Sequence, residues 1–155
     1  MTPAIQAAKR AGIAFQTHSY DHDPNTPSYG EEAAKKLGVP AGRVFKTLVV
    51  ACPKGTLAIG IVPVARQLDL KAIARTLGVK KVELARPADV TRATGYVLGG
   101  VSPLGQKRRL PTRLDTSARD WPTICVSAGR RGLEIELAPD DLLQLTGGVL
   151  ADIAG

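Results

Sequence analysis

A β-hairpin is predicted by residues 43–64, RVFKTLVVACPKGTLAIGIVPV. Its two apolar runs, residues 43–52 and 56–64, are rich in β-branched side chains, which favour strands because they pack well on a pleated surface. Between them stands Pro53-Lys54-Gly55, in which proline fixes one backbone angle and glycine tolerates a left-handed conformation. This combination is typical of a tight turn, so the two strands are expected to pair antiparallel.

A second hairpin is predicted near the end of the chain, where residues 122–127 (PTICVS) and 132–137 (GLEIEL) flank a turn at Gly129–Gly132. Residues 96–113 hold too many glycines and prolines for one regular element. Helices are predicted from their capping signals, including a capping box that begins at Ser28. The predicted helices cover residues 3–11, 31–37, 69–77, 87–94 and 139–146, and further strands cover 13–20 and 80–84.

These elements predict one α+β domain over residues 1–155, in which helices flank a curved, barrel-like mixed sheet. The chain has 155 residues, of which 44% are hydrophobic and 23% are charged, as is usual for a globular domain. No apolar run approaches the roughly 20 residues that span a bilayer, and the N-terminus lacks a signal-peptide pattern. Two cysteines do not make a disulfide framework. We therefore expect a cytoplasmic protein with reduced thiols and no membrane partner.

The charge is unevenly distributed along the chain. Residues 1–131 hold all 21 basic residues and nine of the 14 acidic ones, a net charge of +12, and the rest of the chain is acidic. Basic residues cluster at Lys107-Arg108-Arg109, with Arg113 close behind, and at Arg130-Arg131. Such a field favours a polyanionic partner, although a solvated surface would look the same. Only six residues are aromatic, so nucleic acid would be held by its backbone rather than by stacked bases.

The common catalytic motifs are absent or incomplete. There is no Gly-x-Ser-x-Gly elbow, and residues 100–107 resemble a phosphate-binding loop without its Gly-Lys-Ser/Thr ending. His18 and His22 are four residues apart, a spacing that would suit a metal on a helix but not at the end of a strand. Cys52 and Cys125 stand among apolar strand residues, which indicates structural thiols rather than nucleophiles. We expect no metal and no cofactor.

Three other features could carry chemistry, although each has a structural alternative. Lys46 interrupts an apolar strand, where it either faces solvent or has a task. The segment 99–105, GGVSPLG, could bring free backbone N–H groups close to a ligand or could be only a rigid turn. Ser127-Ala128-Gly129 ends one predicted strand and Glu134 lies on the next, so Ser127 and Glu134 could face one pocket across the hairpin. Alternatively, Glu134 could be an exposed carboxylate beside a hydrogen-bonded turn.

Taken together, these segments resemble the YbaK/EbsC family, the free-standing bacterial Cys-tRNA(Pro) deacylases, which are related to the editing domain of bacterial prolyl-tRNA synthetases. The similarity extends over nearly the whole chain. It is carried by residues 1–15 (MTPAIQAAKRAGIAF), 20–24 (YDHDP), 44–48 (VFKTL), 94–96 (TGY), 99–105 (GGVSPLG), 107–112 (KRRLPT), 126–127 (VS) and 131–136 (RGLEIE).

The resemblance implies the editing-domain fold and the site residues that go with it. Lys46 would meet the phosphate or ribose at the tRNA 3′ end, with Gly99, Gly100 and Ser127 beside it at the reaction centre. The substrate pocket would also include Tyr20, Tyr29, Thr47, Ser102, Pro103, Gly129 and Glu134. Two positions depart from the family, which often has Phe at position 29 and Asp at position 134. The tRNA backbone would be bound by Lys107, Arg108, Arg109, Arg113, Arg130 and Arg131.

The resemblance also implies a reaction in which the thiol of the mischarged cysteine attacks its own ester carbonyl. A substrate that carries its own nucleophile needs only orientation and charge stabilisation from the protein, which is consistent with the missing catalytic motifs. The implied partner is the acceptor end of an aminoacylated tRNA, with prolyl-tRNA synthetase as a possible second partner and no DNA. The alternatives are a deacylase for alanine or serine, a non-catalytic module that binds tRNA or a synthetase, and a binder of sugar phosphates or nucleotides.

Overall fold

A computed structural model describes residues 1–26 and 29–155. The capping box predicted at Ser28 and the side chain of Tyr29 lie outside the described part. The five predicted helices are confirmed as α1 (Pro3–Ala11), α2 (Tyr29–Leu37), α3 (Leu70–Leu77), α4 (Pro87–Thr94) and α5 (Pro139–Thr146), and two 3-10 turns cover Pro53–Gly55 and Thr116–Asp120. The strands are β1 (Phe15–Ser19), β2 (Phe45–Ala51), β3 (Leu57–Pro63), β4 (Glu83–Leu84), β5 (Thr112–Asp115), β6 (Ile124–Arg130), β7 (Leu133–Leu137) and β8 (Val149–Ala151).

The strands form two sheets rather than one curved sheet. The larger has the order β4-β2-β3-β5-β8 and the smaller β1-β7-β6. Both predicted hairpins are present, β2 with β3 and β6 with β7. The larger sheet is mixed, because β5 runs parallel to β3 and β8 runs parallel to β5. The predicted α+β class with a mixed sheet is confirmed, whereas β5 and β8 had no strand signal in the sequence.

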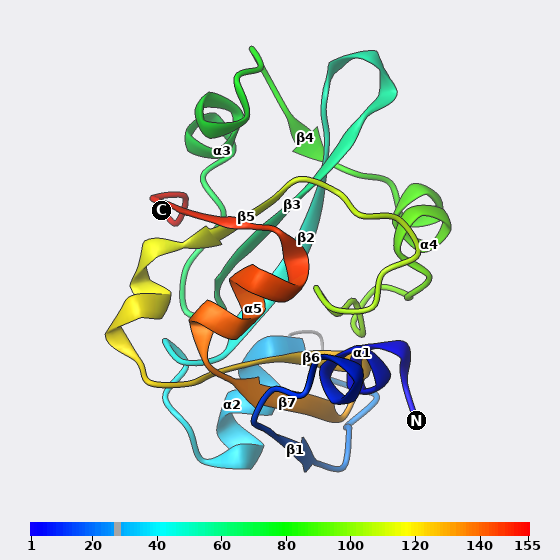
Figure 1. Ribbon diagram of the computed structural model, residues 1–155, viewed down its shortest axis with the longest axis vertical. Coiled ribbons are helices and arrows are strands. Elements are labelled where there is room, and N and C mark those ends of the chain that lie inside the picture. The colour runs from blue at the N-terminus through cyan, green and yellow to red at the C-terminus, as the bar shows by residue number, and fades with distance from the viewer. Residues whose placement is uncertain (27–28) are drawn as a thin grey trace.

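The two sheets meet at the start of β2. A parallel bridge joins Val44 to Cys125 of β6, and the N–H of Cys125 donates to the carbonyl oxygen of Arg43 at 3.0 Å. Figure 1 shows the smaller sheet at one end of the molecule with α1 and α2, and α3 with the β2–β3 turn at the other. The junction between the sheets therefore lies well inside the molecule.

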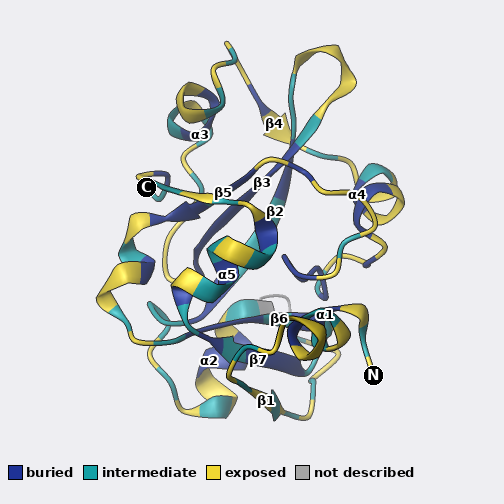
Figure 2. Ribbon diagram, viewed as in Figure 1, coloured by how far each residue is buried: buried dark blue, intermediate teal, exposed yellow. Residues whose placement is uncertain are grey.

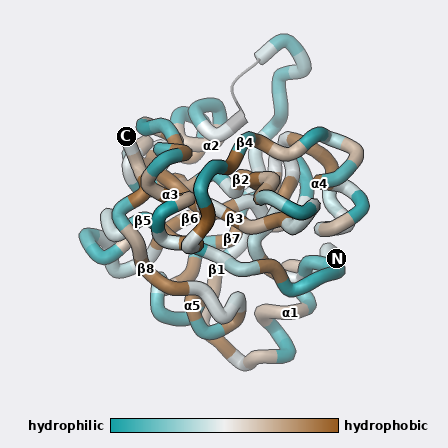
Figure 3. Tube along the Cα trace, turned by 90° about the horizontal axis from the view of Figure 1, so that it is seen from above, coloured by the Kyte–Doolittle hydropathy of each residue, from teal (hydrophilic) through white to brown (hydrophobic). Residues whose placement is uncertain are grey.

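The two faces of β7 differ in chemistry, as the alternation GLEIEL requires. Leu133, Ile135 and Leu137 point into the main hydrophobic core together with residues of β6 and α1. Glu134 and Glu136 point the other way, toward the side that α2 covers. Figure 2 shows buried residues concentrated in the central strands, and Figure 3 shows hydrophobic residues gathered there with hydrophilic ones on the outer loops.

The described helices are all short. None of them has the length and apolar character needed to cross a bilayer. Their ends follow the capping rules from which they were predicted. Thr2 accepts a hydrogen bond from the N–H of Ile5 at the start of α1, and Asp69 does the same for Ala72 at the start of α3.

Candidate substrate cavity

A cavity of about 430 Å³ opens where the two sheets meet. Its wall is built by the first residues of β2, the first turn of α2, the segment before Val101 and the β6–β7 pair. Six of the predicted site residues line it: Tyr20, Lys46, Thr47, Gly99, Ser127 and Glu134. The other lining residues were not among the predicted site residues; they are Gly30, Glu31, Val44, Phe45, Leu48, Val64, Gln67, Leu98 and Val101.

The β6–β7 wall presents a hydroxyl and a carboxyl side by side. Ser127 and Glu134 are directly paired across the two strands, so their side chains lie on the same face. Glu134 is only 6% exposed, and its carboxyl group makes no hydrogen bond or ion pair with the described part of the chain. Burial raises the pKa of Glu134 to about 8. At neutral pH this carboxyl is therefore mostly protonated and can donate a hydrogen bond.

The β2 wall presents an ammonium group and a second hydroxyl. Lys46 is half-buried, and burial lowers its pKa while the nearby carboxylate of Glu31 acts in the opposite direction. The hydroxyl oxygen of Thr47 is buried and has no hydrogen-bond partner in the described structure. An unpaired buried hydroxyl is costly unless a ligand or water satisfies it. Thr47 is thus a hydrogen-bonding group available to a molecule in the cavity.

The close approach of α2 to the larger sheet depends on Gly30. A Cβ atom at this position would lie 2.2 Å from Cγ1 of Val64, well inside van der Waals contact. A glycine in the first turn of a helix normally weakens it, so this position is explained by packing rather than by helix propensity. That packing sets the width of the cavity between Gly30 and Val64.

Tyr20 lines the cavity from the loop after β1, and this loop is hydrogen-bonded both to the β6–β7 turn and to α2. Its N–H donates to the carbonyl oxygen of Gly132 at 3.0 Å, and its pKa is raised, mainly by burial and next by the charge of Glu134. The following loop is held by Glu32, which lies 2.8 Å from Nδ1 of His22 and accepts from the N–H of Asp23. Burial alone would raise the pKa of Glu32, but these hydrogen bonds outweigh it and lower the pKa to about 2.

Of the two adjacent glycines that begin the segment 99–105, one lines the cavity. Gly99 lines the wall with a left-handed φ of 91°. Gly100 does not line it, because its N–H donates to the carbonyl oxygen of Val97 at 3.0 Å and its Cα packs against the backbone of Arg130. A Cβ at Gly100 would lie 2.8 Å from Cα of Arg130. Its N–H is therefore already committed to the turn.

Three other predicted substrate residues support the segment from outside the cavity. Ser102 and Pro103 are buried, and the Ser102 hydroxyl oxygen accepts from the N–H of Leu104 at 3.2 Å. Gly129 packs against the ring of Tyr96, where a Cβ would lie 2.8 Å from a ring carbon. These residues shape the loop and do not contact the space that a substrate would occupy.

The predicted tRNA-binding residues divide into two groups. Lys107, Arg108 and Arg130 are exposed. Arg109 donates to the last-turn carbonyls of α5 at 3.1 and 3.3 Å, and Arg113 donates to the carbonyl oxygen of Thr76 at the end of α3 at 3.2 Å. Arg131 donates to the carbonyl oxygen of Thr26 at 2.6 Å. The second group therefore stabilises helix ends and a loop in the structure.

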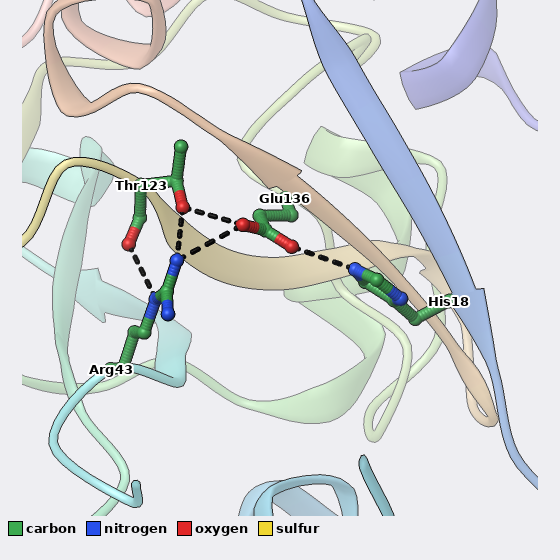
Figure 4. A network of polar contacts seen from close by, with 4 residues as sticks. All are labelled: His18, Arg43, Thr123 and Glu136. Carbon is green, nitrogen blue, oxygen red and sulfur yellow. Dashed lines mark hydrogen bonds and ion pairs between the residues drawn. The ribbon is translucent and has the colours of Figure 1, made fainter. Parts of the chain in front are cut away.

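A charged network lies on the same face of β7, one pleat away from Glu134. Glu136 lies 2.8 Å from His18 and 3.0 Å from Arg43, and the Thr123 hydroxyl donates to it at 2.5 Å. Figure 4 shows Glu136 between these partners. The hydrogen bonds from Thr123 and His18 lower the pKa of Glu136. Neighbouring glutamates thus have opposite properties, Glu136 being ionised and paired, and Glu134 being neutral and unpaired.

No side chain in the described cavity forms a nucleophile–base pair. His18 and Ser127 pair with Glu134 from opposite sides, so two strand spacings, about 10 Å, separate them. Cys125 is 1% exposed, and its pKa is raised to about 12, first by burial and then by the two glutamates of β7. Cys52 does not line the cavity. Among the described residues, no group of three or more His, Cys, Asp or Glu side chains could hold a metal ion.

Comparison with known proteins identifies the family. The model of the aminoacyl-tRNA editing domain matches residues 23–145. The chain belongs to the aminoacyl-tRNA editing domain family. It is 45% identical over 152 residues to EbsC of Enterococcus faecalis, which is provisionally named a Cys-tRNA(Pro)/Cys-tRNA(Cys) deacylase, and the match covers 98% of this chain and 92% of EbsC.

Longer and solved relatives of this editing domain agree with that assignment. A proline–tRNA ligase of Solidesulfovibrio magneticus is 33% identical over 114 residues, which cover 71% of this chain and 19% of the ligase. A crystal structure described as a provisional trans-editing enzyme for prolyl-tRNA synthetase superposes with a TM-score of 0.81 at 26% identity, covering 100% of this chain and 99% of that one. The resemblance found in the sequence is therefore confirmed.

Proposed function

We propose that this protein is a single-domain trans-editing deacylase that removes cysteine from Cys-tRNA(Pro), and also from Cys-tRNA(Cys). Three observations support it: the editing-domain family, the 45% identity to EbsC, and a cavity that carries six of the predicted site residues. The observation that carries the mechanism is the composition of the cavity. Its described lining holds a cation, hydroxyls and a neutral carboxyl, but no activated nucleophile.

The missing nucleophile is supplied by the substrate. The thiol of the esterified cysteine loses its proton, and its sulfur attacks the ester carbonyl carbon of the same residue. A C–S bond forms, the C–O bond to the terminal ribose breaks, and the departing oxygen takes up a proton to restore the ribose hydroxyl. The products are a cyclic thioester and free tRNA, and water then opens the ring to give cysteine. Such an intramolecular attack needs mainly a fixed geometry and a stabilised oxyanion.

The cavity residues can supply both requirements. Lys46 is a cation beside the site where the phosphate or ribose of the 3′ end would lie, and the unpaired hydroxyl of Thr47 can orient the substrate. Gly99 lines the cavity, and we assign its backbone N–H the task of stabilising the developing oxyanion. Glu134 and Ser127 would bind the cysteinyl group from the opposite wall. Because Glu134 is held neutral, this wall does not repel the negative charge that develops on the substrate.

An editing site of this kind solves a discrimination problem. Cysteine and proline are similar in size, and a difference of one methylene gives a synthetase pocket only about 1–3 kcal/mol of selectivity. A second site must then remove the errors. Lys107, Arg108 and Arg130 are exposed and would hold the tRNA backbone, which carries no direct information about which tRNA is bound. We therefore propose that prolyl-tRNA synthetase presents the mischarged tRNA(Pro) to this protein.

The decisive experiment follows loss of the ester bond in a panel of charged tRNAs: Cys-tRNA(Pro), Cys-tRNA(Cys), Ser-tRNA(Pro) and Ala-tRNA(Pro). The two cysteinyl esters should be cleaved rapidly, and the seryl ester much more slowly, because a hydroxyl is a weaker nucleophile than a thiolate. Equal rates for cysteinyl and seryl esters would indicate attack by water and refute the mechanism. If only the alanyl or seryl ester is cleaved, the proposed specificity is wrong. Binding of tRNA without any cleavage would leave a non-catalytic module.

A further inference from the structure

A second hollow, of about 520 Å³, lies between the β2–β3 turn, β4 and α4. It is separate from the cavity described above and shares none of its lining residues. Three arginines line it, Arg86, Arg92 and Arg108, together with the acidic Glu83 and Asp89. Lys80 and Lys81 are exposed directly before β4, so the surroundings of this hollow are basic.

The arginines of the hollow are only weakly committed within the protein. Asp89 is shared, lying 3.4 Å from Nε of Arg86 and 3.3 Å from Nη1 of Arg92. The two arginine side chains are 87% and 77% exposed, and exposed ion pairs of this kind contribute little to stability. Arg108 has no ion pair or side-chain hydrogen bond with any residue that the structure describes. An incoming phosphate can therefore engage these guanidinium groups at little cost.

One rigid segment connects the hollow to the substrate cavity. Residues 95–108 leave the end of α4 and return to it, since the N–H of Lys107 donates to the carbonyl oxygen of Thr94 at 3.0 Å and that of Arg108 to Ala93 at 3.1 Å. The segment is braced inside by the Tyr96 hydroxyl, which donates to the carbonyl oxygen of Leu104 at 2.7 Å. Its base therefore lies at the hollow and its tip at the cavity.

The separation between the two sites matches a few nucleotides. Ala93 lines the hollow and Leu98 lines the cavity, and the five residue steps from one to the other span at most about 18 Å. A nucleic-acid strand in a duplex rises about 3.4 Å per nucleotide, so the hollow lies within about five nucleotides of the cavity. Between them, Val97 and Leu98 are 65% and 55% exposed and offer an apolar surface on which a base face can rest.

We propose that the hollow formed by Arg86, Arg92 and Arg108 binds backbone phosphates of the tRNA within a few nucleotides of its aminoacylated end. The inference rests on the proposed function, because it assumes that the aminoacyl group occupies the cavity. A third hollow, of about 600 Å³, has no such excess of positive charge, because Arg75 and Arg113 are matched in number there by Asp69 and Asp152. In this arrangement the 3′ strand of the tRNA runs from the cavity over Val97 toward Lys107 and Arg108.

The test compares two double variants that lose the same charge. Arg92→Gln with Arg108→Gln removes two residues of the hollow, and Arg75→Gln with Lys71→Gln removes two exposed charges from α3. Arg92 and Arg75 are matched, since each is an exposed arginine in the last turn of an eight-residue helix. Binding of uncharged tRNA(Pro) is measured from about 50 to 200 mM salt, a range over which phosphate contacts weaken strongly. Deacylation is measured with Cys-tRNA(Pro) and with 3′-O-cysteinyladenosine, which has no backbone phosphate.

The hollow variant should weaken tRNA binding about tenfold or more and reduce the slope of log Kd against log salt by about 2. Its KM for Cys-tRNA(Pro) should rise with kcat unchanged, and its rate on cysteinyladenosine should equal that of the parent. The control variant should match the parent in all of these. Parent-like tRNA affinity and salt slope in the hollow variant would overturn the inference, as would an equal loss in the control. If the parent cleaves neither substrate, the proposed function fails, while the salt slopes still decide whether the hollow binds tRNA.

Discussion

Replacing Glu134 by Gln should make the protein more stable at neutral pH. The carboxyl of Glu134 is buried and unpaired among the described residues, and burial raises its pKa from 4.5 to about 8. In the unfolded chain the group loses its proton near pH 4.5, whereas in the folded chain it keeps the proton until about pH 8. Between these values the folded state binds more protons than the unfolded state, so stability falls as the pH rises. Glutamine has the same shape but cannot ionise in either state.

The size of the effect follows from the width of this window. One pKa unit is worth about 1.4 kcal/mol, so the advantage of Glu134→Gln should be near zero at pH 4.5 and grow by about 1.4 kcal/mol per pH unit above it. It should reach about 3 kcal/mol at pH 7 and level off near pH 8. Urea unfolding of the parent and the variant at half-unit pH intervals measures the difference, provided that the slope of free energy against urea is the same in both proteins.

Glu136→Gln is the matched control, because Glu136 lies on the same strand and face but is paired with Arg43 and His18. Its pKa is lowered, mainly by hydrogen bonds from Thr123 and His18. Its ionised form therefore stabilises the folded state above pH 4.5, and this contribution is lost as the pH falls through the lowered pKa. Glu136→Gln should destabilise the protein at neutral pH, and the penalty should shrink toward acid. If the free energies of unfolding of the parent and Glu134→Gln ran parallel across the pH range, Glu134 would not be a carboxyl that burial keeps neutral.

Three further results follow from the cavity. Lys46→Ala should lower kcat/KM for Cys-tRNA(Pro) by about 10²–10³-fold, with Lys71→Ala as the exposed control, and an unchanged rate would remove Lys46 from the mechanism. The double variant Cys52→Ala with Cys125→Ala should deacylate Cys-tRNA(Pro) like the parent, since the attacking thiol belongs to the substrate; complete loss of activity in a folded variant would contradict this. Gly30→Ala should cost about 1–3 kcal/mol in urea unfolding and reduce activity as α2 is pushed away from the sheet, whereas an unaltered protein would show that the contact with Val64 yields easily.

The regular elements were predictable wherever local signals determined them. The helix that begins after Thr2 and ends at Gly12, and the one between Asp69 and Gly78, have caps that the sequence displays directly. The missed strands β5 and β8 are only four and three residues long, and each pairs parallel to a neighbour distant in the sequence. Parallel pairing of this kind carries no turn signal, because the connection is long and passes outside the sheet.

The site was predictable where the alternation of side chains along a strand and the geometry of the turn determine which way a side chain points. Ser127 and Glu134 end up on one wall because a hairpin register forces paired residues onto the same face. The burial of Glu134 was not predictable from the strand pattern, since an alternating glutamate normally faces solvent; here α2 and the start of β2 cover that face. The hydrogen bond that commits the N–H of Gly100 to Val97 and the arginines that cap helix ends are tertiary details without a local signature.

A substrate-borne nucleophile also explains how a cavity without a steric sieve could spare the correct product. The prolyl group of Pro-tRNA(Pro) fits any space that accepts a cysteinyl group, because the two side chains are similar in size. Proline, however, has no thiol that could attack its own ester. In the proposed mechanism its ester therefore survives even when it is bound, and discrimination is transferred from binding to reactivity. The same logic exposes Cys-tRNA(Cys), which carries the same thiol. The lining of Lys46, Thr47 and Glu134 offers nothing that would distinguish the two cysteinyl esters, so the choice between them has to be made on the tRNA outside the cavity.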